Sequence, residues 1–376
     1  MPEKRYLLTP GPTPVPPEVL AAMAQPVVHH RSPDFRPVLE RTLARLAAVY
    51  RTTNDVLMFT ASGTAAMESA VANLVAPGDR VTVASFGHFG ERWTEIARAY
   101  GADVDVLAYE WGDAPSPDDL AGRGAKVVFL THSETSTGVV ADLRALAAVA
   151  KEDGSLVVVD AISSLGAVPL ETDAWGIDVV VSGSQKALMT PPGLAFASVS
   201  EAAYAARSTS PRYYLDWERT RVAQAKLDAA YTPAVSIIAG LDVALGLLLE
   251  EGLDGAFERH VRLGRACRAG AKSMGLELFS PDDDSSAVVT AIRAPDGVDA
   301  TELVQALRDR HGITIANGQG ALKGQVFRIG HIGYFDVFDV VAALAAVELV
   351  LADLGADVER GVATARALEV YEGAPV

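Results

Sequence analysis

Residues 156–186, LVVVDAISSLGAVPLETDAWGIDVVVSGSQK, decide the fold. The stretch contains two short apolar runs, Leu156–Val159 and Val179–Val181, which are rich in valine and show little alternation of apolar and polar residues. Such runs are typical of strands that are buried on both faces of a sheet. Asp160 comes directly after the first run, and Lys186 comes soon after the second. Both polar residues are therefore expected at strand ends.

Runs of the same kind recur on either side of this stretch. They are Val56–Phe59, Arg80–Ser85, Lys126–Thr131 and Leu194–Val199, and helical stretches near Thr64–Val75, Phe89–Tyr100 and Leu143–Lys151 lie between some of them. Alternating strands and helices predict an α/β fold, with a largely parallel sheet that has helices on both sides. Ligands of such sheets bind beyond the carboxyl ends of the strands, so the candidate site lies there.

The segment ahead of the first strand has a different character. Leu7–Pro17 (LLTPGPTPVPP) contains too many prolines for a helix or a central strand, which predicts an extended arm or lid. Ser32 and Pro33 predict the cap and the first turn of a helix. Behind them, apolar residues recur at helical spacing from Phe35 to Tyr50.

After Glu201 the strand signals fade, and a second, smaller unit follows. Ser236–Leu253 is predicted to be one long apolar helix that leads to it. The predicted strands are Ala287–Ile292, Ile313–Ala316 and Val326–Ile329, and the predicted helices flanking them are Ala300–Arg310 and Val337–Leu354. We expect an N-terminal arm over 1–20, a large domain over 21–255 and a small C-terminal α/β domain over 256–376.

Composition excludes several classes of function. The chain has 376 residues, of which 49% are hydrophobic and 21% are charged, as expected for a globular protein of two domains. A net charge of −16 disfavours nucleic acid and anionic membranes as partners. Cys267 is the single cysteine, which rules out an intrachain disulfide or a clustered-cysteine metal site, and no metal is expected. The N-terminus shows no signal peptide or membrane span, which predicts a cytoplasmic protein.

Three features carry chemistry. Ser62, Gly63 and Thr64 follow a strand and open a helix, where free backbone N–H groups would bind an anion. Asp160 puts a carboxylate at the binding edge of the sheet, and Lys186 puts an amine there. Taken singly, each has a simpler explanation: a tight turn with a helix cap, an acid that caps a turn, and a surface lysine. The loop is neither of the common glycine-rich nucleotide loops, so nucleotide cofactors are disfavoured.

Taken together, the three features point to one cofactor. A phosphate cradle, a carboxylate for a protonated pyridine nitrogen and an amine for a Schiff base are the contacts that pyridoxal 5'-phosphate needs. Partial burial would make the neutral, nucleophilic form of Lys186 accessible.

The sequence also resembles the class V aminotransferases, most of all the alanine–glyoxylate and serine–pyruvate aminotransferases. The resemblance covers nearly the whole chain and rests on LLTPGPTPVPPEV (7–19), ASGTAAME (61–68), FGHFGERW (86–93), THSETSTGVV (131–140), VVVDAISSLG (157–166), GIDVVVSGSQKAL (176–188), YTPAVS (231–236) and FRIGHIG (327–333). It implies the fold-type-I architecture of pyridoxal-phosphate transferases, in which a large domain with a mostly parallel seven-stranded type of sheet precedes a smaller α/β domain.

The resemblance also assigns roles to residues. Phe89 matches the aromatic residue that stacks on the cofactor ring, Thr135 matches a hydroxyl residue that bonds the cofactor, and Gln185 and Thr232 match phosphate contacts. Thr232 would come from the neighbouring subunit, which implies a homodimer with shared active sites. Arg328 matches the arginine that holds the substrate carboxylate, and Pro10 and Gly11 lie in the segment that lines the substrate entrance.

Two points depart from the family pattern or stay open. Relatives place a tyrosine three residues before the threonine, where this chain has Ala229, and the nearby Tyr231 is a possible substitute. His29, His30 and Arg31 form a basic cluster that would either receive a second acidic group of the substrate or be a polar loop.

The implied activity is transamination between a small amino acid, alanine or serine, and a 2-oxo acid, glyoxylate or pyruvate. Lys186 would hold the cofactor and move the proton, while Asp160 would keep the ring nitrogen protonated. Phosphoserine, aspartate, a ureidoglycine or an aminophosphonate are alternative donors. A cysteine desulfurase is disfavoured because the late loop Ala316–Gly324 has no cysteine, and a catalytically idle subunit is disfavoured because Lys186, Asp160 and Arg328 are all present.

Overall fold

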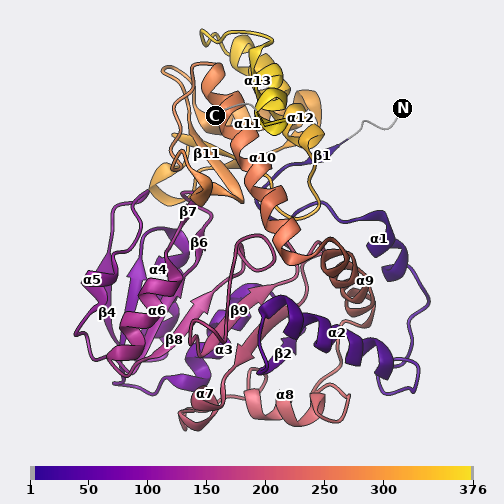
Figure 1. Ribbon diagram of the computed structural model, residues 1–376, viewed down its shortest axis with the longest axis vertical. Coiled ribbons are helices and arrows are strands. Elements are labelled where there is room, and N and C mark those ends of the chain that lie inside the picture. Colours follow the sequence, from indigo (N-terminus) through magenta and orange to yellow (C-terminus); the bar gives the residue numbers. More distant parts are fainter. Residues whose placement is uncertain (1–4, 374–376) are drawn as a thin grey trace.

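The computed structural model describes residues 5–373, so residues 1–4 of the predicted arm and 374–376 of the predicted small domain lie outside the described residues. Figure 1 shows two lobes, a larger one built on a wide sheet and a smaller one above it. The large lobe holds a seven-stranded sheet and the small lobe a three-stranded one.

The wide sheet has the strand order β2–β10–β9–β8–β5–β3–β4. Its strands are β2 (Asp55–Phe59), β3 (Arg80–Ser85), β4 (Asp103–Ala108), β5 (Val127–Thr131), β8 (Leu156–Asp160), β9 (Val179–Gly183) and β10 (Ala195–Val199). All neighbouring pairs run parallel except those that β10 makes with β2 and β9. The predicted α/β class with a largely parallel sheet is confirmed.

Helices cover both faces of this sheet, as predicted, because its central strands are apolar on both sides. Val157 and Val159 of β8 point into one core and Val158 into the other. The first core is closed by α2 (Arg36–Tyr50), α6 (Leu143–Glu152) and α9 (Val235–Glu251). The second is closed by α3 (Gly63–Leu74), α4 (His88–Ala99), α7 (Glu201–Ala205) and α8 (Trp217–Gln224).

The carboxyl edge of the wide sheet faces the small lobe. After β5, the short hairpin of β6 (Ser133–Glu134) and β7 (Val139–Val140) reaches the turn η1 (Asp284–Ser286) of the small lobe. There, the Ser286 hydroxyl donates to the carbonyl of Gly138 at 3.0 Å. Residues at the ends of β5, β8 and β9 therefore lie where the two lobes meet. The remaining helix of the large lobe, α5 (Pro117–Leu120), follows β4.

In the described part of the chain, the small lobe combines an antiparallel sheet of order β11–β14–β13 with helices that pack on it, and α13 packs on two of these helices, α10 and α12. Its elements are α10 (Leu253–Ser273), β11 (Val289–Arg293), α11 (Ala300–His311), β13 (Ala316–Asn317), the turn η2 (Gly320–Leu322), β14 (Val326–Gly330), α12 (Val337–Asp353) and α13 (Val362–Tyr371). The predicted domain boundary at 255 falls in the first turn of α10, and the domain limits stay a prediction.

The N-terminal arm links the two lobes. Its strand β1 (Tyr6–Leu7) pairs in parallel with β12 (Ile313–Thr314) of the small lobe. The backbone N–H of Gly330 donates to the carbonyl of Leu8 at 2.9 Å. The chain then passes the carboxyl edge of the wide sheet without regular structure and enters α1 (Pro17–Met23), which packs on α9. The predicted extended conformation is confirmed as far as this helix.

Two local predictions are wrong. The helix predicted to begin at Ser32 and Pro33 begins at Arg36, with Phe35 at the cap position and a proline in its first turn. The chain is still turning at Ser32, whose N–H donates to the carbonyl of His29 and whose hydroxyl has no partner among the described residues. Burial of Phe35, which is 1% exposed, sets the start of the helix instead.

The predicted single strand Ile313–Ala316 is two strands in two sheets. β12 pairs with the arm, while β13 pairs with β14. Ile315 between them is buried in the core of the small lobe, so the chain changes partner at this residue. Periodicity alone could not reveal this change of partner, because both halves are apolar.

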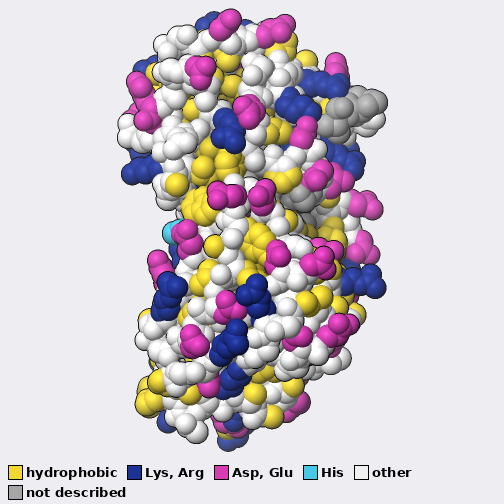
Figure 2. All heavy atoms as spheres, turned by 90° about the vertical axis from the view of Figure 1, so that its left-hand side faces the viewer, with side chains coloured by type: hydrophobic (Ala, Val, Ile, Leu, Met, Phe, Trp, Pro, Cys, Tyr) yellow, Lys and Arg dark blue, Asp and Glu magenta, His cyan; other side chains and the backbone are white. Residues whose placement is uncertain are grey.

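Surface charge is mixed rather than segregated. Figure 2 shows one face of the molecule, on which acidic, basic and hydrophobic side chains are interspersed over both lobes. The molecule is narrower between the two lobes than across either of them. Within residues 5–373, no helix combines the length and the hydropathy needed to cross a bilayer.

Candidate active site

One cavity of about 240 Å³ lies at the carboxyl edge of the wide sheet and collects most of the predicted site residues. Its lining includes Gly11, Ser62, Gly63, Thr64, Phe89, Asp160, Gln185 and Lys186, together with Pro12, Arg92, Ser133, Ile162, Ser163 and Pro192, which sequence reasoning did not single out. The lining comes from the arm, the starts of α3 and α4, and the segments that follow β5, β8 and β9. The topology, not sequence proximity, brings them together.

Lys186 is buried in this cavity and is held at both ends. Its Nζ donates to the carbonyl oxygen of Pro10 at 2.6 Å, and its own carbonyl oxygen accepts a bond from the Thr13 hydroxyl at 3.0 Å. A Cβ added at Gly11, whose φ is +142°, would lie 2.4 Å from Lys186 Cε. Only a glycine at this position of the arm leaves room for the lysine side chain. Burial, aided by the charge of Arg328, lowers the pKa of Lys186 to about 8. The simpler explanation as a surface lysine is wrong.

Asp160 is the last residue of β8 and is 4% exposed. Its Oδ1 accepts a bond from the N–H of Ile162 at 2.8 Å, so it does cap the turn, as the simpler explanation proposed. No hydrogen bond from residues 5–373 reaches the second carboxylate oxygen, which leaves it for a ligand in the cavity. Burial raises the pKa of Asp160 to about 7, although the bond from Ile162 opposes the shift. A cationic partner in the cavity would favour the charged form.

The start of α3 has the features of an anion site. Ser62 is the cap residue in an extended conformation, and its side chain makes no capping bond. The first N–H groups of a helix lack intrahelical partners and carry the positive end of the helix dipole. A Cβ at Gly63 would lie 2.6 Å from Ile162 Cδ1, so only glycine lets the loop pack this closely. The Thr64 hydroxyl accepts a bond from Arg92 Nη1 at 3.2 Å.

Unsatisfied polar atoms occur in the cavity lining, at Ser133 and Gln185, and at Thr135, which follows Ser133 closely in the chain but does not itself line the cavity. Thr135 Oγ1, Gln185 Oε1 and Ser133 Oγ are buried and have no hydrogen-bond partner among the described residues. Buried polar atoms are nearly always paired, so such a group indicates a polar ligand. An anion site, a carboxylate, an amine and these orphaned atoms fit pyridoxal phosphate.

Arg328 lies on β14, on the side of the small lobe that faces the cavity segments. Its Nε and Nη2 donate to the carbonyl of Asn317 at 3.0 and 2.8 Å, and its Nη1 donates to the carbonyl of Thr135 at 2.6 Å. Among the described contacts, one N–H remains on each terminal nitrogen, which suits a carboxylate bound by two parallel bonds. Burial lowers the pKa of Arg328 to about 10.

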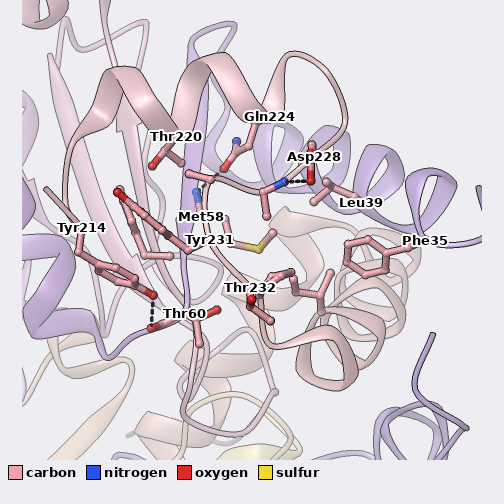
Figure 3. A pocket seen from close by; sticks show the side chains of 15 residues that line it. Phe35, Leu39, Met58, Thr60, Tyr214, Thr220, Gln224, Asp228, Tyr231 and Thr232 are labelled. Carbon is pink, nitrogen blue, oxygen red and sulfur yellow. Dashed lines mark hydrogen bonds between the residues drawn. The ribbon is translucent and has the colours of Figure 1, made fainter. Parts of the chain in front are cut away.

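Thr232 does not line this cavity in its own chain. It is exposed and lies with Tyr214 and Tyr231 at a small hollow of about 30 Å³ on the large lobe, between α2 and α8 (Figure 3). The Tyr231 hydroxyl donates to the carbonyl of Tyr213 at 2.8 Å, and its ring stacks on Tyr214 with 4.9 Å between centroids. Tyr231 is therefore engaged within its own chain. Whether it replaces the tyrosine missing at Ala229 stays open.

The basic cluster lies on the same face as Thr232. His29 and His30 line a shallow surface hollow together with Thr232, and Arg31 forms an ion pair of 3.5 Å with Asp228. Within one chain this cluster is separate from the cavity that holds Lys186. A contact with substrate would have to come from a second copy, and it stays a prediction.

Comparison with known proteins gives the family. The model for "Aminotransferase class-V" matches residues 5–331. An L-aspartate–glyoxylate aminotransferase of Paracoccus denitrificans is 35% identical over 99% of this chain and 97% of its own. The solved ureidoglycine–glyoxylate aminotransferase of Bacillus subtilis is 33% identical, covers 99% of both chains and superposes with a TM-score of 0.93. The chain belongs to the class V aminotransferases.

The family resemblance noted in the sequence, the fold-type-I class and the transaminase activity are thereby confirmed. Two relatives carry a different kind of name. A "Soluble hydrogenase, small subunit" of a Synechococcus is 42% identical over 94% of this chain and 95% of its own, and a "Soluble hydrogenase 42 kDa subunit" of Anabaena cylindrica is 41% identical over 99% of this chain and 100% of its own. Solved cysteine desulfurases are only 16% and 21% identical and share the fold alone. Cys267, the single cysteine of this aminotransferase, is buried in α10 and is therefore not the loop cysteine that a desulfurase would need.

Sequence reasoning missed two charged residues of this aminotransferase. Arg92 lines the cavity with its guanidinium 4.8 Å from the centroid of the Phe89 ring. The spacing of three residues on one helix places both on one face, and that signal could have found Arg92. Glu134 lies in β6 and is completely buried. Nothing in the pattern of a two-residue strand shows where its carboxylate points.

Lys186 makes the stability of the cofactor-free enzyme depend on pH. Its pKa falls from 10.5 to about 8 on folding, so between these values the unfolded chain binds a proton that the folded chain lacks. The free energy of unfolding therefore rises with pH in this window, by about 3 kcal/mol in total. Urea unfolding of the wild type and Lys186→Met from about pH 7 to about pH 11 should show their difference growing in favour of the wild type. A constant difference would contradict the burial of this amine.

Proposed function

We propose that this enzyme uses pyridoxal phosphate to transfer an amino group between alanine or serine and glyoxylate or pyruvate. The observation that carries the proposal is the single cavity lined by Lys186, Asp160 and the Ser62–Thr64 loop. The relatives named after aspartate–glyoxylate and ureidoglycine–glyoxylate activities support glyoxylate as the acceptor.

Each part of the cofactor has a protein group to hold it. Ser62, Gly63 and Thr64 would bind the phosphate, with Gln185 beside them. Phe89 would lie against the ring, and the orphaned hydroxyl of Thr135 would donate a hydrogen bond to it. When bound, pyridoxal phosphate supplies a conjugated ring that takes up the electron pair left when the substrate loses its α-proton.

Asp160 and Lys186 then divide the proton chemistry. Asp160 would keep the ring nitrogen protonated, because its carboxylate closes a buried strand and, among the described residues, only Oδ1 is engaged, by the N–H of Ile162. Lys186 would hold the cofactor through Nζ, and its amine would move the proton at the substrate α-carbon. Since its pKa is lowered to about 8, the neutral amine is accessible near neutral pH. The carbonyl of Pro10 offers the released amine a fixed position.

Arg328 orients the substrate through its carboxylate. We expect Arg328→Leu to raise KM for the amino donor about 100-fold, because two charge-assisted hydrogen bonds are lost. Arg328→Lys should recover only part of this loss, since an ammonium cannot make the paired bonds. Steady-state kinetics with alanine and with serine measure both variants. An unchanged KM in Arg328→Leu would remove Arg328 from the substrate site.

We also propose that the active form is a cytoplasmic homodimer. Thr232 is exposed and away from the cavity of its own chain, and the neighbouring Tyr213 and Tyr214 are large exposed side chains, 65% and 41% exposed. A second copy packed on this face would cover them, and Thr232 would then complete the cavity of that copy. Analytical ultracentrifugation of the wild type tests whether the protein is a dimer. Cofactor titration of the wild type and Thr232→Ala tests whether Thr232 completes the cavity of the second copy.

One experiment separates the donors. Single half-reactions with alanine, serine, aspartate, phosphoserine and glutamate, followed by absorbance of the bound cofactor, should be fastest with alanine or serine. Aspartate is the second candidate, because Arg92 puts a cation in the lining of the cavity and a relative is named for aspartate. A clear preference for aspartate or phosphoserine would replace the proposed donor, and no bleaching with any donor would overturn the transamination.

A further inference from the structure

Glu134 is a buried carboxylate that none of the roles above uses. Its side chain is 0% exposed, and four donors point at it. Oε2 accepts bonds from the backbone N–H groups of Phe89 at 2.9 Å and Gly90 at 3.3 Å. Oε1 accepts bonds from the N–H and the hydroxyl of Ser136. Because backbone N–H groups can only donate, these bonds favour the ionised carboxylate, although burial, the larger effect, raises the pKa of Glu134.

These bonds fix the first turn of α4. The cap residue of this helix is Gly87, which has no side chain to cap it. Glu134 and Ser136 take its place from another element, since the Ser136 hydroxyl also accepts a bond from the N–H of His88 at 3.1 Å. A Cβ at Gly87 would lie 2.4 Å from Glu134 Cγ and 2.6 Å from Cδ, so the glycine leaves the space that Glu134 fills. A negative charge at this end also complements the helix dipole.

The same short segment touches both binding groups of the site. Through Phe89 N, Glu134 holds the residue whose ring lines the cavity. Through its neighbour Thr135, whose carbonyl accepts from Arg328 Nη1 at 2.6 Å, the segment holds the guanidinium that faces the substrate. One segment thus connects a helix start of the large lobe with a strand of the small lobe.

We propose that Glu134 is a positioning residue, which sets the orientation of the Phe89 ring against the cofactor by clamping the first turn of α4. The inference rests on the proposed function, because it takes pyridoxal phosphate as the group that Phe89 contacts. If Glu134 were only a structural helix cap, its substitution would lower the stability of the protein. The folded protein that remained would bind the cofactor as the wild type does.

Cofactor affinity and the circular dichroism of the bound cofactor separate these two roles. In Glu134→Gln, which keeps the shape of the side chain, we expect the Kd for pyridoxal phosphate to rise about tenfold, the effect of one disturbed buried hydrogen bond. The dichroism of the cofactor band should also change, because it reports ring orientation. Ser136→Ala, which leaves the carboxylate in place, should give a smaller change in the same direction.

Asp142→Ala is the matched control. The Asp142 carboxylate caps α6 by accepting a bond from the N–H of Ala145 at 3.1 Å, and its side chain takes no part in the cavity. This variant should lose stability while its Kd for the cofactor and its dichroism stay at wild-type values. If Glu134→Gln behaves like Asp142→Ala, Glu134 is only a structural cap and the proposal is overturned.

A double-mutant cycle tests the route through Phe89. In a Phe89→Leu background the ring is gone, so Glu134→Gln should raise the Kd for the cofactor less than about twofold further. An undiminished tenfold loss in that background would show that Glu134 does not act through Phe89. Wild-type protein that binds no pyridoxal phosphate would instead reject the proposed function, so the two failures are distinguishable.

Discussion

Lys186→Ala should lower kcat with alanine or serine by at least about 10⁴-fold, the upper range for the loss of a general acid–base. The variant loses both the covalent anchor for the cofactor and the amine that moves the proton. The cavity around the residue stays intact, because Pro10 and Gly11 reach it through their backbone. Stopped-flow single turnovers with cofactor in excess measure the rate without interference from weakened binding.

The control is a lysine of similar chemistry elsewhere. Lys272 is half-exposed and pairs with Asp282 on the surface of the small lobe. Lys272→Ala should retain the wild-type kcat. Added methylamine should restore part of the activity of Lys186→Ala, because a free amine can enter the space that the side chain leaves. A Lys186→Ala enzyme that transaminates at the wild-type rate would refute the assignment of the proton shuttle.

Asp160→Asn should lower kcat about 10²–10³-fold with little change in KM, the size of effect seen when one preorganised electrostatic partner is removed. An amide is neutral, so it cannot keep the ring nitrogen protonated, although it still lines the cavity and can accept the bond from Ile162. Steady-state kinetics measure kcat and KM, and the absorbance of the bound cofactor reports the protonation of its ring nitrogen.

Asp178→Asn is the corresponding control for Asp160→Asn. Asp178 is also a buried carboxylate, but it lies before the start of β9, where it pairs with Lys151 at 2.8 Å and accepts a bond from Val157 N. We expect a loss of stability with an unchanged kcat for the folded enzyme. If both variants lost activity equally, the effect at Asp160 would be structural.

The sequence located the site well because the ends of buried strands can be recognised from short apolar runs. The short valine-rich runs Leu156–Val159 and Val179–Val181 place Asp160 and Lys186 at the carboxyl edge of a parallel sheet, where ligands bind. The family motifs then named residues such as Phe89 and Gln185, which do line the cavity. Predictions of this kind succeed because they depend on local patterns that survive in any packing.

The sequence could not show in which direction a side chain points or which group it contacts. β4, whose residues are mostly half-buried, and α13, a ten-residue helix near the end of the described chain, carry weak apolar patterns and were not predicted. The carbonyls of Pro10 and Thr135 are backbone groups, so residue identity does not show what they bind. The direction in which the Glu134 carboxylate points is likewise not visible in the sequence. The prediction of a helix cap at Ser32 was wrong because the burial of Phe35 decides where α2 begins.

The central claim is that Lys186 bonds the cofactor. Borohydride reduction of the wild-type enzyme in the presence of pyridoxal phosphate, followed by proteolysis and peptide mass spectrometry, tests it most directly. We predict one phosphopyridoxyl group, on Lys186, and none on that peptide after prior incubation with an amino donor. Labelling of another lysine alone, or no labelling at all, would contradict the account.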